Sequence, residues 1–388
     1  MDRRVGPDPV ARARELAGEL AAAADAIEST RRIPDALLAR LHAARMYRML
    51  LPRSLDGDEV EPGHYVLTLE EIARHDASVA WNVFVGNSAA LIAPYLEPAT
   101  ARTIFADPCA IVAWGPPNAT QATAVPGGYR VTGTWSFASG CRNATWMGVH
   151  CQVVEPDGTL RLDRAGRATA RTLLFPAAQA TLIDSWHTIG LRGTASDSYR
   201  LCALFVSEAH TGTREDPAAR REPGPLYAFT MQGLYAMGVA GVGLGIAGAM
   251  LAELSELAGR KSPRGLERMA DSTPVQAGVA EAEAKLRSAR AYVLSTLADI
   301  HARANERAPI EVPDRARVRL AATHAIHAAV EVADFVYKAA GVDSIFPGGP
   351  FERRFRDMHT VSQQIQSRDA HYETVGQVLL GNPPEVFL

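Results

Sequence analysis

The segment from Phe229 to Ala252 contains no charged residue, and this restricts where a folded chain can place it. Its length approaches the roughly 20 residues that span a bilayer. Glycines, however, recur every two or three residues in its second half, and small residues at such spacing let neighbouring helices approach closely. A helix that is apolar on all sides is buried in a protein core or a membrane. We predict a helix inside a bundle or a subunit interface, and no membrane span.

Three blocks of different composition follow one another along the chain. The first is rich in Ala, Leu, Glu and Arg, with apolar residues three and four apart, which predicts amphipathic helices. In the second, Thr, Val and aromatic residues alternate with polar ones between glycine-containing turns, which predicts short β strands. Helical patterning then returns. We predict an N-terminal helical domain at residues 1–108, a middle β domain at 109–215 and a C-terminal helical bundle at 216–388.

The overall composition is that of a globular protein with a large core, because 47% of the 388 residues are hydrophobic and 21% are charged. A formal net charge of -3 gives no basic surface for nucleic acid or anionic lipid, so the expected partner is a small molecule or another protein. The four cysteines form no C-x-x-C pair, and the N-terminal residues lack the apolar core of a signal peptide. We expect reduced thiols, no metal site and a cytoplasmic location.

Three sequence motifs carry a resemblance to a known family. They are Gly-Thr-Trp-Ser-Phe-Ala-Ser-Gly at 133–140, Gly-Leu-Arg-Gly-Thr-Ala-Ser-Asp at 190–197 and Arg-Phe-Arg-Asp at 354–357. Together, and in this order, they resemble the acyl-CoA dehydrogenase superfamily. The W-x-F-x-S-G form resembles its flavin-dependent monooxygenase branch, which contains the oxygenase components of two-component hydroxylases. The resemblance covers essentially the whole chain.

The resemblance implies an α+β multidomain fold with an N-terminal helical domain, a middle β-barrel and a C-terminal four-helix bundle. It also implies a homotetramer and a flavin bound between barrel and bundle. In this branch, reduced FMN or FAD comes from a separate flavin reductase and reacts with O2 to a C4a-hydroperoxyflavin, which oxygenates a small aromatic or amine-type substrate. No segment of the chain resembles a nicotinamide-binding domain, which agrees with a separate reductase.

By the resemblance, the Ser139 hydroxyl hydrogen-bonds flavin N5 and the Phe137 ring lies along the isoalloxazine. A flat apolar ring needs an apolar wall, and N5 needs a hydrogen-bond partner in a dry site. The other expected flavin contacts are Trp114, Gly115, Ala138 and Trp186. From the residues alone, the alternation along 135–139 also fits an ordinary strand, and Trp114 fits a core anchor equally well.

A glutamate base is missing where the dehydrogenases of the superfamily have one. They place it either beyond the Arg-Asp motif or on the glycine-containing helix, and it removes the substrate α-proton. In this chain the first carboxylate after Asp357 is Asp369, and Phe229 to Ala252 contains no acid. Glutamine cannot replace it, because an amide does not titrate near neutrality. A dehydrogenase or oxidase with a non-standard base is therefore the alternative function, followed by a catalytically silent binding or assembly subunit.

Two residues compete for the polar catalytic position beside Ser139. Many hydroxylases of this branch have a histidine some eight residues after the motif arginine, where this chain has Gln364 and keeps His359 nearby. On one continuous helix these two side chains lie about 140° apart, so only one of them can face the flavin. His359 would act as a base for a phenolic substrate. Gln364 would suit an amine or an electron-rich heteroatom that needs little activation.

The predicted helix around residues 78–87 contributes the expected substrate contacts, Trp81 and Asn87, because in relatives it borders the substrate pocket. A buried core tryptophan is the alternative role of Trp81. Arg356 and Asp357 are expected to form a structural ion pair and helix cap rather than to take part in the chemistry.

Overall fold

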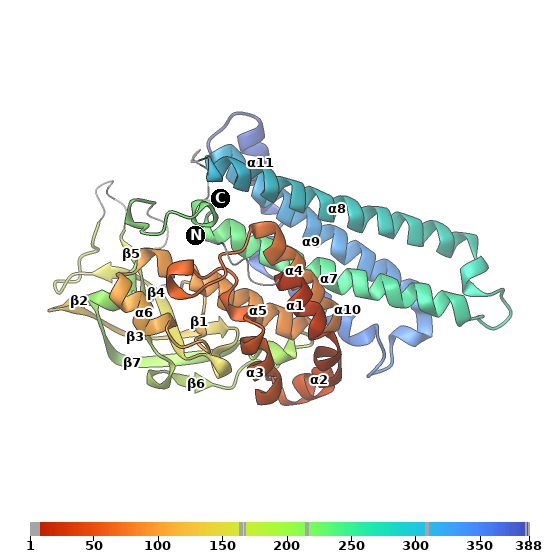
Figure 1. Ribbon diagram of the computed structural model, residues 1–388, viewed down its shortest axis with the longest axis horizontal. Coiled ribbons are helices and arrows are strands. Elements are labelled where there is room, and N and C mark those ends of the chain that lie inside the picture. Colours follow the sequence, from red (N-terminus) through yellow and green to blue (C-terminus); the bar gives the residue numbers. More distant parts are fainter. Residues whose placement is uncertain are drawn as a thin grey trace.

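The structure is a computed structural model that describes residues 8–162, 166, 168–213, 217–306, 310–384 and 386. Helices come first along the chain, then strands, then helices again (Figure 1). This order confirms the predicted fold class, with an N-terminal helical domain, a middle sheet domain and a C-terminal helical domain. The predicted boundary between residues 215 and 216 lies outside the described residues.

Helix α5 lies between the sheet and the C-terminal helices, and it contacts both. The α-helices before the sheet are α1 (Pro9–Glu15), α2 (Ala17–Thr30), α3 (Asp35–Ala43), α4 (Pro62–His75), α5 (Ala77–Ala90) and α6 (Pro98–Phe105). Asp76 caps α5, because its carboxylate accepts a hydrogen bond from the Val79 amide at 2.8 Å. Almost every side chain of α5 is buried, which explains why its sequence shows no polar face.

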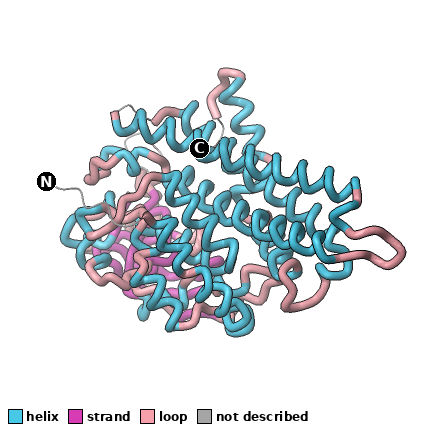
Figure 2. Tube along the Cα trace, turned by 45° about the vertical axis from the view of Figure 1, so that its right-hand side comes forward, coloured by secondary structure: helices cyan, strands magenta, loops and turns pink. Residues whose placement is uncertain are grey.

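One eight-stranded sheet forms the middle of the chain, in the order β6-β7-β3-β2-β4-β5-β8, with β1 also paired to β4. The strands are β1 (Val112–Trp114), β2 (Gln121–Val125), β3 (Gly128–Ala138), β4 (Trp146–Val154), β5 (Ala170–Pro176), β6 (Thr181–Ile183), β7 (Asp197–Ser207) and β8 (Thr211–Gly212). Figure 2 shows the strands gathered at one end of the molecule. The antiparallel pairing of β3 with β7 shifts register between Trp135 and Ala138, which marks a β-bulge.

The C-terminal part is dominated by α7 (Met231–Arg260), α8 (Thr273–Asn305) and α9 (Val312–Ala340), which run side by side (Figure 1). Two shorter helices follow, α10 (Glu352–Val361) and α11 (Ala370–Leu379). The uncharged, glycine-containing segment forms the first part of α7. Among the described helices α7 is long and apolar enough to cross a membrane, but 89% of its most apolar window is buried inside the protein. It is the core helix that the sequence predicts.

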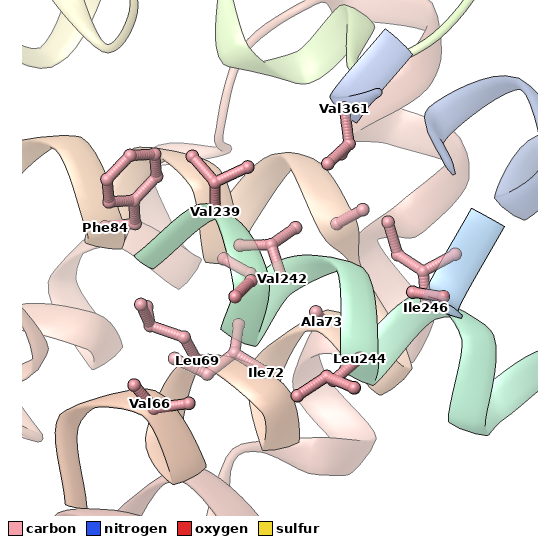
Figure 3. Close-up of a cluster of buried hydrophobic side chains, with 14 of the residues drawn as sticks. Val66, Leu69, Ile72, Ala73, Phe84, Val239, Val242, Leu244, Ile246 and Val361 are labelled. Atoms are coloured by element: carbon pink, nitrogen blue, oxygen red, sulfur yellow. The ribbon is translucent and has the colours of Figure 1, made fainter. Parts of the chain in front are cut away.

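The glycines of α7 allow the N-terminal helices to pack directly on its backbone. A Cβ atom on Gly245 would overlap the Glu70 carbonyl oxygen of α4, and one on Gly238 would overlap the Phe84 ring of α5. The result is a continuous apolar core in which α4, α5, α7 and α10 meet (Figure 3). The core residues labelled there are Val66, Leu69, Ile72, Ala73, Phe84, Val239, Val242, Leu244, Ile246 and Val361.

Helix α10 ends at Val361, so the expected continuous helix through Gln366 is wrong. Gln364 has extended backbone angles, φ -72° and ψ 145°, and begins a short 3₁₀ turn at Ile365–Ser367. Its side-chain oxygen accepts a hydrogen bond from the Gln366 amide at 2.6 Å, which fixes the turn. The relative directions of His359 and Gln364 therefore do not follow helix geometry.

Candidate active site

The β-bulge in the first motif turns the Phe137 side chain out of the sheet core. Phe137 has a φ of 61°, a left-handed conformation that costs a phenylalanine free energy and persists only where the surrounding structure imposes it. Trp135 before the bulge is buried, whereas Phe137 is 63% exposed and meets the Trp186 ring edge-to-face at 6.1 Å. Trp135 and Phe137 therefore do not share one face, as a regular strand would place them. The bulge creates an exposed apolar surface close to the buried Ser139.

Ser139 lies in a chain of buried hydroxyl groups that joins the first two motifs. The Trp81 indole Nε1 donates a hydrogen bond to Ser139 Oγ at 3.1 Å. Ser139 Oγ lies 2.6 Å from Ser196 Oγ, which in turn lies 2.7 Å from Thr194 Oγ1. Thr194 donates to the Leu191 carbonyl oxygen at 2.8 Å. The structure thus brings a residue expected to be catalytic, Ser139, into direct contact with one expected to bind substrate, Trp81.

Asn87, on the same helix as Trp81, does not join this cluster. Its side-chain oxygen accepts from the Leu50 amide at 3.1 Å, and its side-chain nitrogen donates to the Met46 carbonyl at 2.7 Å. These main-chain contacts fasten the segment before α4 to α5, so Asn87 has a structural position. Asn82, next to Trp81, donates to the Gly193 carbonyl at 3.2 Å and holds the second motif against α5.

Gly115 follows β1 at a point where two strands come close. A Cβ atom there would overlap the Ser136 carbonyl oxygen, so only glycine fits. Its amide donates to the Tyr199 hydroxyl oxygen at 3.4 Å. The Trp114 ring is partly buried and meets His150 edge-to-face at 4.9 Å. This packing fits the core-anchor role of Trp114 that the sequence also allows.

Trp186 and Ala138 are both fixed by Asp197 at the start of β7. The Asp197 carboxylate accepts from the Trp186 amide at 3.0 Å, and Ala138 is its register partner across the sheet. The Trp186 indole donates to the Leu191 carbonyl oxygen at 2.9 Å, the same oxygen that ends the hydroxyl chain. Trp186 is thereby held with its ring beside Phe137.

Gln364 reaches the Ser139 cluster through a series of aromatic contacts. Its side chain lies near the Tyr235 phenol of α7, and burial raises the pKa of that phenol, so Tyr235 is neutral. The Tyr235 ring meets Phe84 at 4.5 Å, and Phe84 meets Trp81 at 5.1 Å, both edge-to-face. Trp81 then contacts Ser139. An amide and a phenol therefore lie at one end of an apolar path that leads to Ser139.

His359 is held elsewhere, against helix α9. Its Nε2 lies 2.9 Å from a carboxylate oxygen of Asp334, and its ring packs at 4.3 Å from Phe355. No hydrogen bond or ring contact joins His359 to the Ser139 cluster in the part of the chain that the structure describes. The structure thus separates two of the residues expected to be catalytic, Ser139 and His359, and connects Ser139 with Gln364.

The predicted ion pair between Arg356 and Asp357 is wrong. Adjacent residues on a helix point in different directions. Arg356 pairs with Glu352 one turn earlier and with Glu28 of α2 at 2.9 Å. Asp357 is buried, and its carboxylate accepts from the Leu191 amide at 2.6 Å. Burial raises the pKa of Asp357 to about 7. The Arg-Asp motif therefore fastens α10 to both α2 and the second motif.

Two family models match the chain. The model of the N-terminal domain of acyl-CoA dehydrogenase matches residues 10–102, and the model of its C-terminal domain matches residues 237–368. Indole-3-acetate monooxygenase from Pseudomonas putida is 32% identical over 347 residues, which cover 87% of this chain and 85% of that protein. The chain belongs to the acyl-CoA dehydrogenase superfamily.

Two further similar proteins indicate to which branch of the superfamily the chain belongs. The oxygenase component of an FADH2-dependent resorcinol hydroxylase from Rhizobium sp. (strain MTP-10005) is 29% identical over 396 residues, covering 95% of both chains. XiaF from Streptomyces sp., solved in complex with FADH2 and glycerol, shares the fold with a TM-score of 0.89 at 23% identity, covering 98% of this chain and 96% of that one. The chain is an oxidoreductase of the flavin-dependent monooxygenase branch.

The residues present are of the kinds that a flavin needs. Phe137 offers an exposed apolar surface beside Trp186, and Ser139 offers a buried hydroxyl next to it. The side-chain oxygen of Asn82 is buried and has no hydrogen-bond partner among the residues that the structure describes, and a Cβ atom on Gly140 would lie 3.1 Å from it. An unpartnered buried acceptor beside an apolar wall is typical of a site that is completed by a ligand.

Sequence reasoning missed three residues of this cluster. Ser196 and Thr194 lie within the second motif, and hydroxyl groups inside this motif could have predicted that both residues belong to the site. Tyr235 was the single phenol in the apolar part of α7 and therefore a polar group that needed a partner. Gln364, which lies near this phenol, is far away in the sequence.

Proposed function

We propose that this protein is the oxygenase component of a two-component system, which oxygenates a small aromatic or amine-type substrate with O2 and reduced flavin. A separate reductase supplies the flavin, as FMN or FAD. One observation carries the proposal: where dehydrogenases of this superfamily need a carboxylate base, the connection after α10 presents the Gln364 amide against the Tyr235 phenol. Neither group removes a substrate α-proton at neutral pH. The monooxygenase and hydroxylase names of the relatives support it.

Each residue of the site has a role in this proposal. Bound reduced flavin supplies the activation of O2. Phe137 and Trp186 form the apolar wall for its ring and keep water away from it. Ser139 hydrogen-bonds its N5, and the Gly115 main chain allows its edge to approach the sheet. These roles require that the flavin ring lies beside the β-bulge of β3.

Gln364 and Tyr235 orient the substrate. An amide and a neutral phenol both donate and accept hydrogen bonds, so they can hold a polar substituent and fix the position of the atom to be oxygenated. Because neither titrates near neutrality, they orient the substrate without deprotonating it. The site therefore favours an amine or an electron-rich ring whose reaction needs no protein base.

The test mixes the protein with chemically reduced FAD or FMN under anaerobic conditions and then adds isotopically labelled O2 and a panel of electron-rich aromatic compounds and amines. We expect a product that contains one labelled oxygen atom, detected by mass spectrometry, and only when the flavin is reduced beforehand. Ser139→Ala should lower the yield of product per O2 consumed by about tenfold. Ser198→Ala removes a neighbouring hydroxyl of β7 as the matched control.

Two results would overturn the proposal. Oxidation of an acyl thioester with oxidised flavin in the absence of O2 would establish the alternative dehydrogenase function. Binding of neither flavin redox state would establish the catalytically silent alternative.

We also propose a homotetramer in the cytoplasm. Several large apolar side chains are exposed in the turn after α9 and at the end of α11: Val342, Ile345, Phe346, Leu379 and Leu380. Contacts between subunits would remove such side chains from water. Light scattering on the purified protein should give four chains per particle, and a monomer at micromolar concentration would contradict this part of the proposal.

A further inference from the structure

We propose that Ser196 and Thr194 are positioning residues that orient the Ser139 hydroxyl as a hydrogen-bond acceptor, so that the site binds reduced flavin more tightly than oxidised flavin. This inference rests on the proposed function, because it assigns Ser139 to flavin N5. It concerns the direction of one chain of hydrogen bonds, which runs from Trp81 through Ser139, Ser196 and Thr194 to the Leu191 carbonyl.

Both ends of this chain have a fixed polarity. The indole N–H of Trp81 can only donate, and it donates to Ser139 Oγ at 3.1 Å. The Leu191 carbonyl oxygen can only accept, and it accepts the proton of Thr194 at 2.8 Å. The two serine hydroxyls lie between these ends, and each has one proton. The ends therefore determine which way both serine protons point.

The proton of Ser139 is committed to Ser196. Thr194 has given its only proton to Leu191, so at the 2.7 Å contact it accepts from Ser196. Ser196 has then used its proton, so at the 2.6 Å contact it accepts from Ser139. Ser139 accepts from Trp81 as well, and a single lone pair of its oxygen remains. A ligand atom that approaches Ser139 Oγ meets an acceptor.

The main-chain donors next to Ser139 are also committed. The Ser139 amide donates to the Phe137 carbonyl at 3.0 Å, and the Gly140 amide donates to the Thr194 carbonyl at 2.9 Å. The side chains of the hydroxyl chain are all buried, which hinders water from reorienting them. These neighbours therefore offer no donor that could replace the Ser139 proton.

The two redox states of a flavin differ in what N5 requires. N5 of a reduced flavin has a hydrogen and donates, whereas N5 of an oxidised flavin has only a lone pair and accepts. When an oxidised flavin binds at this site, either its N5 and Ser139 Oγ face each other as two acceptors, or Ser139 must break its hydrogen bond to Ser196. Each case leaves a buried polar atom unpaired, so we expect about tenfold weaker binding of oxidised flavin. The direction of this chain of hydrogen bonds therefore favours reduced flavin where both redox states are present.

The substitutions Ser196→Ala and Thr194→Val test this inference. Either one removes an acceptor that commits the Ser139 proton, so Ser139 becomes free to donate to oxidised N5. Fluorescence titrations with oxidised flavin, and anaerobic titrations with reduced flavin, give the ratio of the two Kd values. We expect a ratio of about ten in the wild type and near one in both variants, because the oxidised form binds more tightly. The midpoint potential of bound flavin should fall by about 30 mV, which is tenfold for a two-electron couple.

Ser198→Ala is the matched control. Ser198 lies on β7, two residues after Ser196, but its hydroxyl contacts Ser136 and Ser185 and is not part of the chain of hydrogen bonds. Thermal unfolding shows whether each variant is folded. Equal Kd ratios in all three variants and the wild type, or a wild type that binds both redox states equally, would overturn the inference and leave the proposed function intact. A protein that binds neither redox state would overturn both.

Discussion

The imidazole of His359 lies 2.9 Å from the carboxylate of Asp334, an acid on helix α9. This contact fastens α10 to α9, whereas the Gln364 side chain lies near the Tyr235 phenol. We expect His359→Ala to lower the free energy of unfolding by about 1 kcal/mol, because the pair is partly exposed to solvent, and to leave product yield within about twofold. Gln364→Ala should lower product yield by about tenfold and, because it also removes the hydrogen bond to the Gln366 amide, lower the free energy of unfolding by about 1 kcal/mol. Chemical denaturation and product analysis of both variants measure these effects.

Gln363→Ala is the control for Gln364, because Gln363 is exposed and its side chain hydrogen-bonds the neighbouring Ser362 hydroxyl. Full product yield in Gln364→Ala together with a lost yield in folded His359→Ala would reverse the assignment. It would show that His359 moves to the site when flavin binds.

The Phe137 side chain should matter for flavin and not for folding. Its ring is 63% exposed in a backbone conformation that the bulge imposes, so truncation removes little buried area. We expect Phe137→Ala to raise the Kd for reduced flavin about tenfold and to change the free energy of unfolding by less than about 0.5 kcal/mol. Phe205→Ala, at another exposed phenylalanine of the sheet, should change neither quantity. If Phe137→Ala lowered the free energy of unfolding and left the Kd for reduced flavin unchanged, Phe137 would not be an apolar wall for the flavin ring.

The sequence predicted the fold well because the signals that specify it are local. Periods of three and four residues mark the helices, alternation marks the strands, and the uncharged glycine-containing segment marks α7. The candidate site, in contrast, could not be predicted from such local patterns. The bulge at Phe137 is set by how β3 pairs with β7, and the end of α10 is set by packing and by the Gln364 side chain. The bulge depends on a strand distant in the sequence, and the end of α10 depends on a side-chain hydrogen bond that helical periodicity does not reveal. Extending the helical pattern along this segment therefore placed Gln364 on a helix that ends before it.

Two glycines of α7 should respond to alanine in opposite directions. At Gly245 a Cβ atom overlaps the main chain of α4, which cannot move without repacking the core, so Gly245→Ala should lower the free energy of unfolding by about 3 kcal/mol. At Gly259, near the end of the same helix, nothing lies within 4 Å of the added atom. Gly259→Ala should therefore raise stability by about 0.5 kcal/mol through helix propensity. Equal effects of the two substitutions in denaturant unfolding would contradict the close helix approach.

Asp357 should make the protein less stable as pH rises. Burial raises its folded-state pKa to about 7, well above the ordinary aspartate pKa of 3.8, so the folded protein binds the proton more tightly than the unfolded chain does. The contribution is fully present below about pH 4 and is lost as pH rises through 7. Asp357→Asn keeps an oxygen to accept from Leu191 and should be more stable than wild type at pH 8 by roughly 2 kcal/mol, and no more stable at pH 4. Denaturant unfolding across this range measures the difference, with exposed Asp35→Asn as control.

A stability difference between wild type and Asp357→Asn that does not change with pH would show that Asp357 carries no proton in the folded state. Its carboxylate would then have to be stabilised by the cations nearby, among them Arg356 and Arg354.

Arg319 of α9 is a buried cation without a partner among the described residues. It is 4% exposed, its Nη1 has no hydrogen bond, and burial lowers the pKa of its guanidinium to about 10. A buried charge without a counter-charge destabilises a fold, so Arg319→Met should raise the free energy of unfolding by about 1 kcal/mol. Arg12→Met is the contrasting control, because Arg12 is buried in an ion pair with Asp58 at 2.6 Å and its removal should cost about 3 kcal/mol. Similar losses in both variants would instead show that Arg319 has an acidic partner in the assembled protein, and unfolding measured over a range of protein concentrations would reveal whether another subunit provides it.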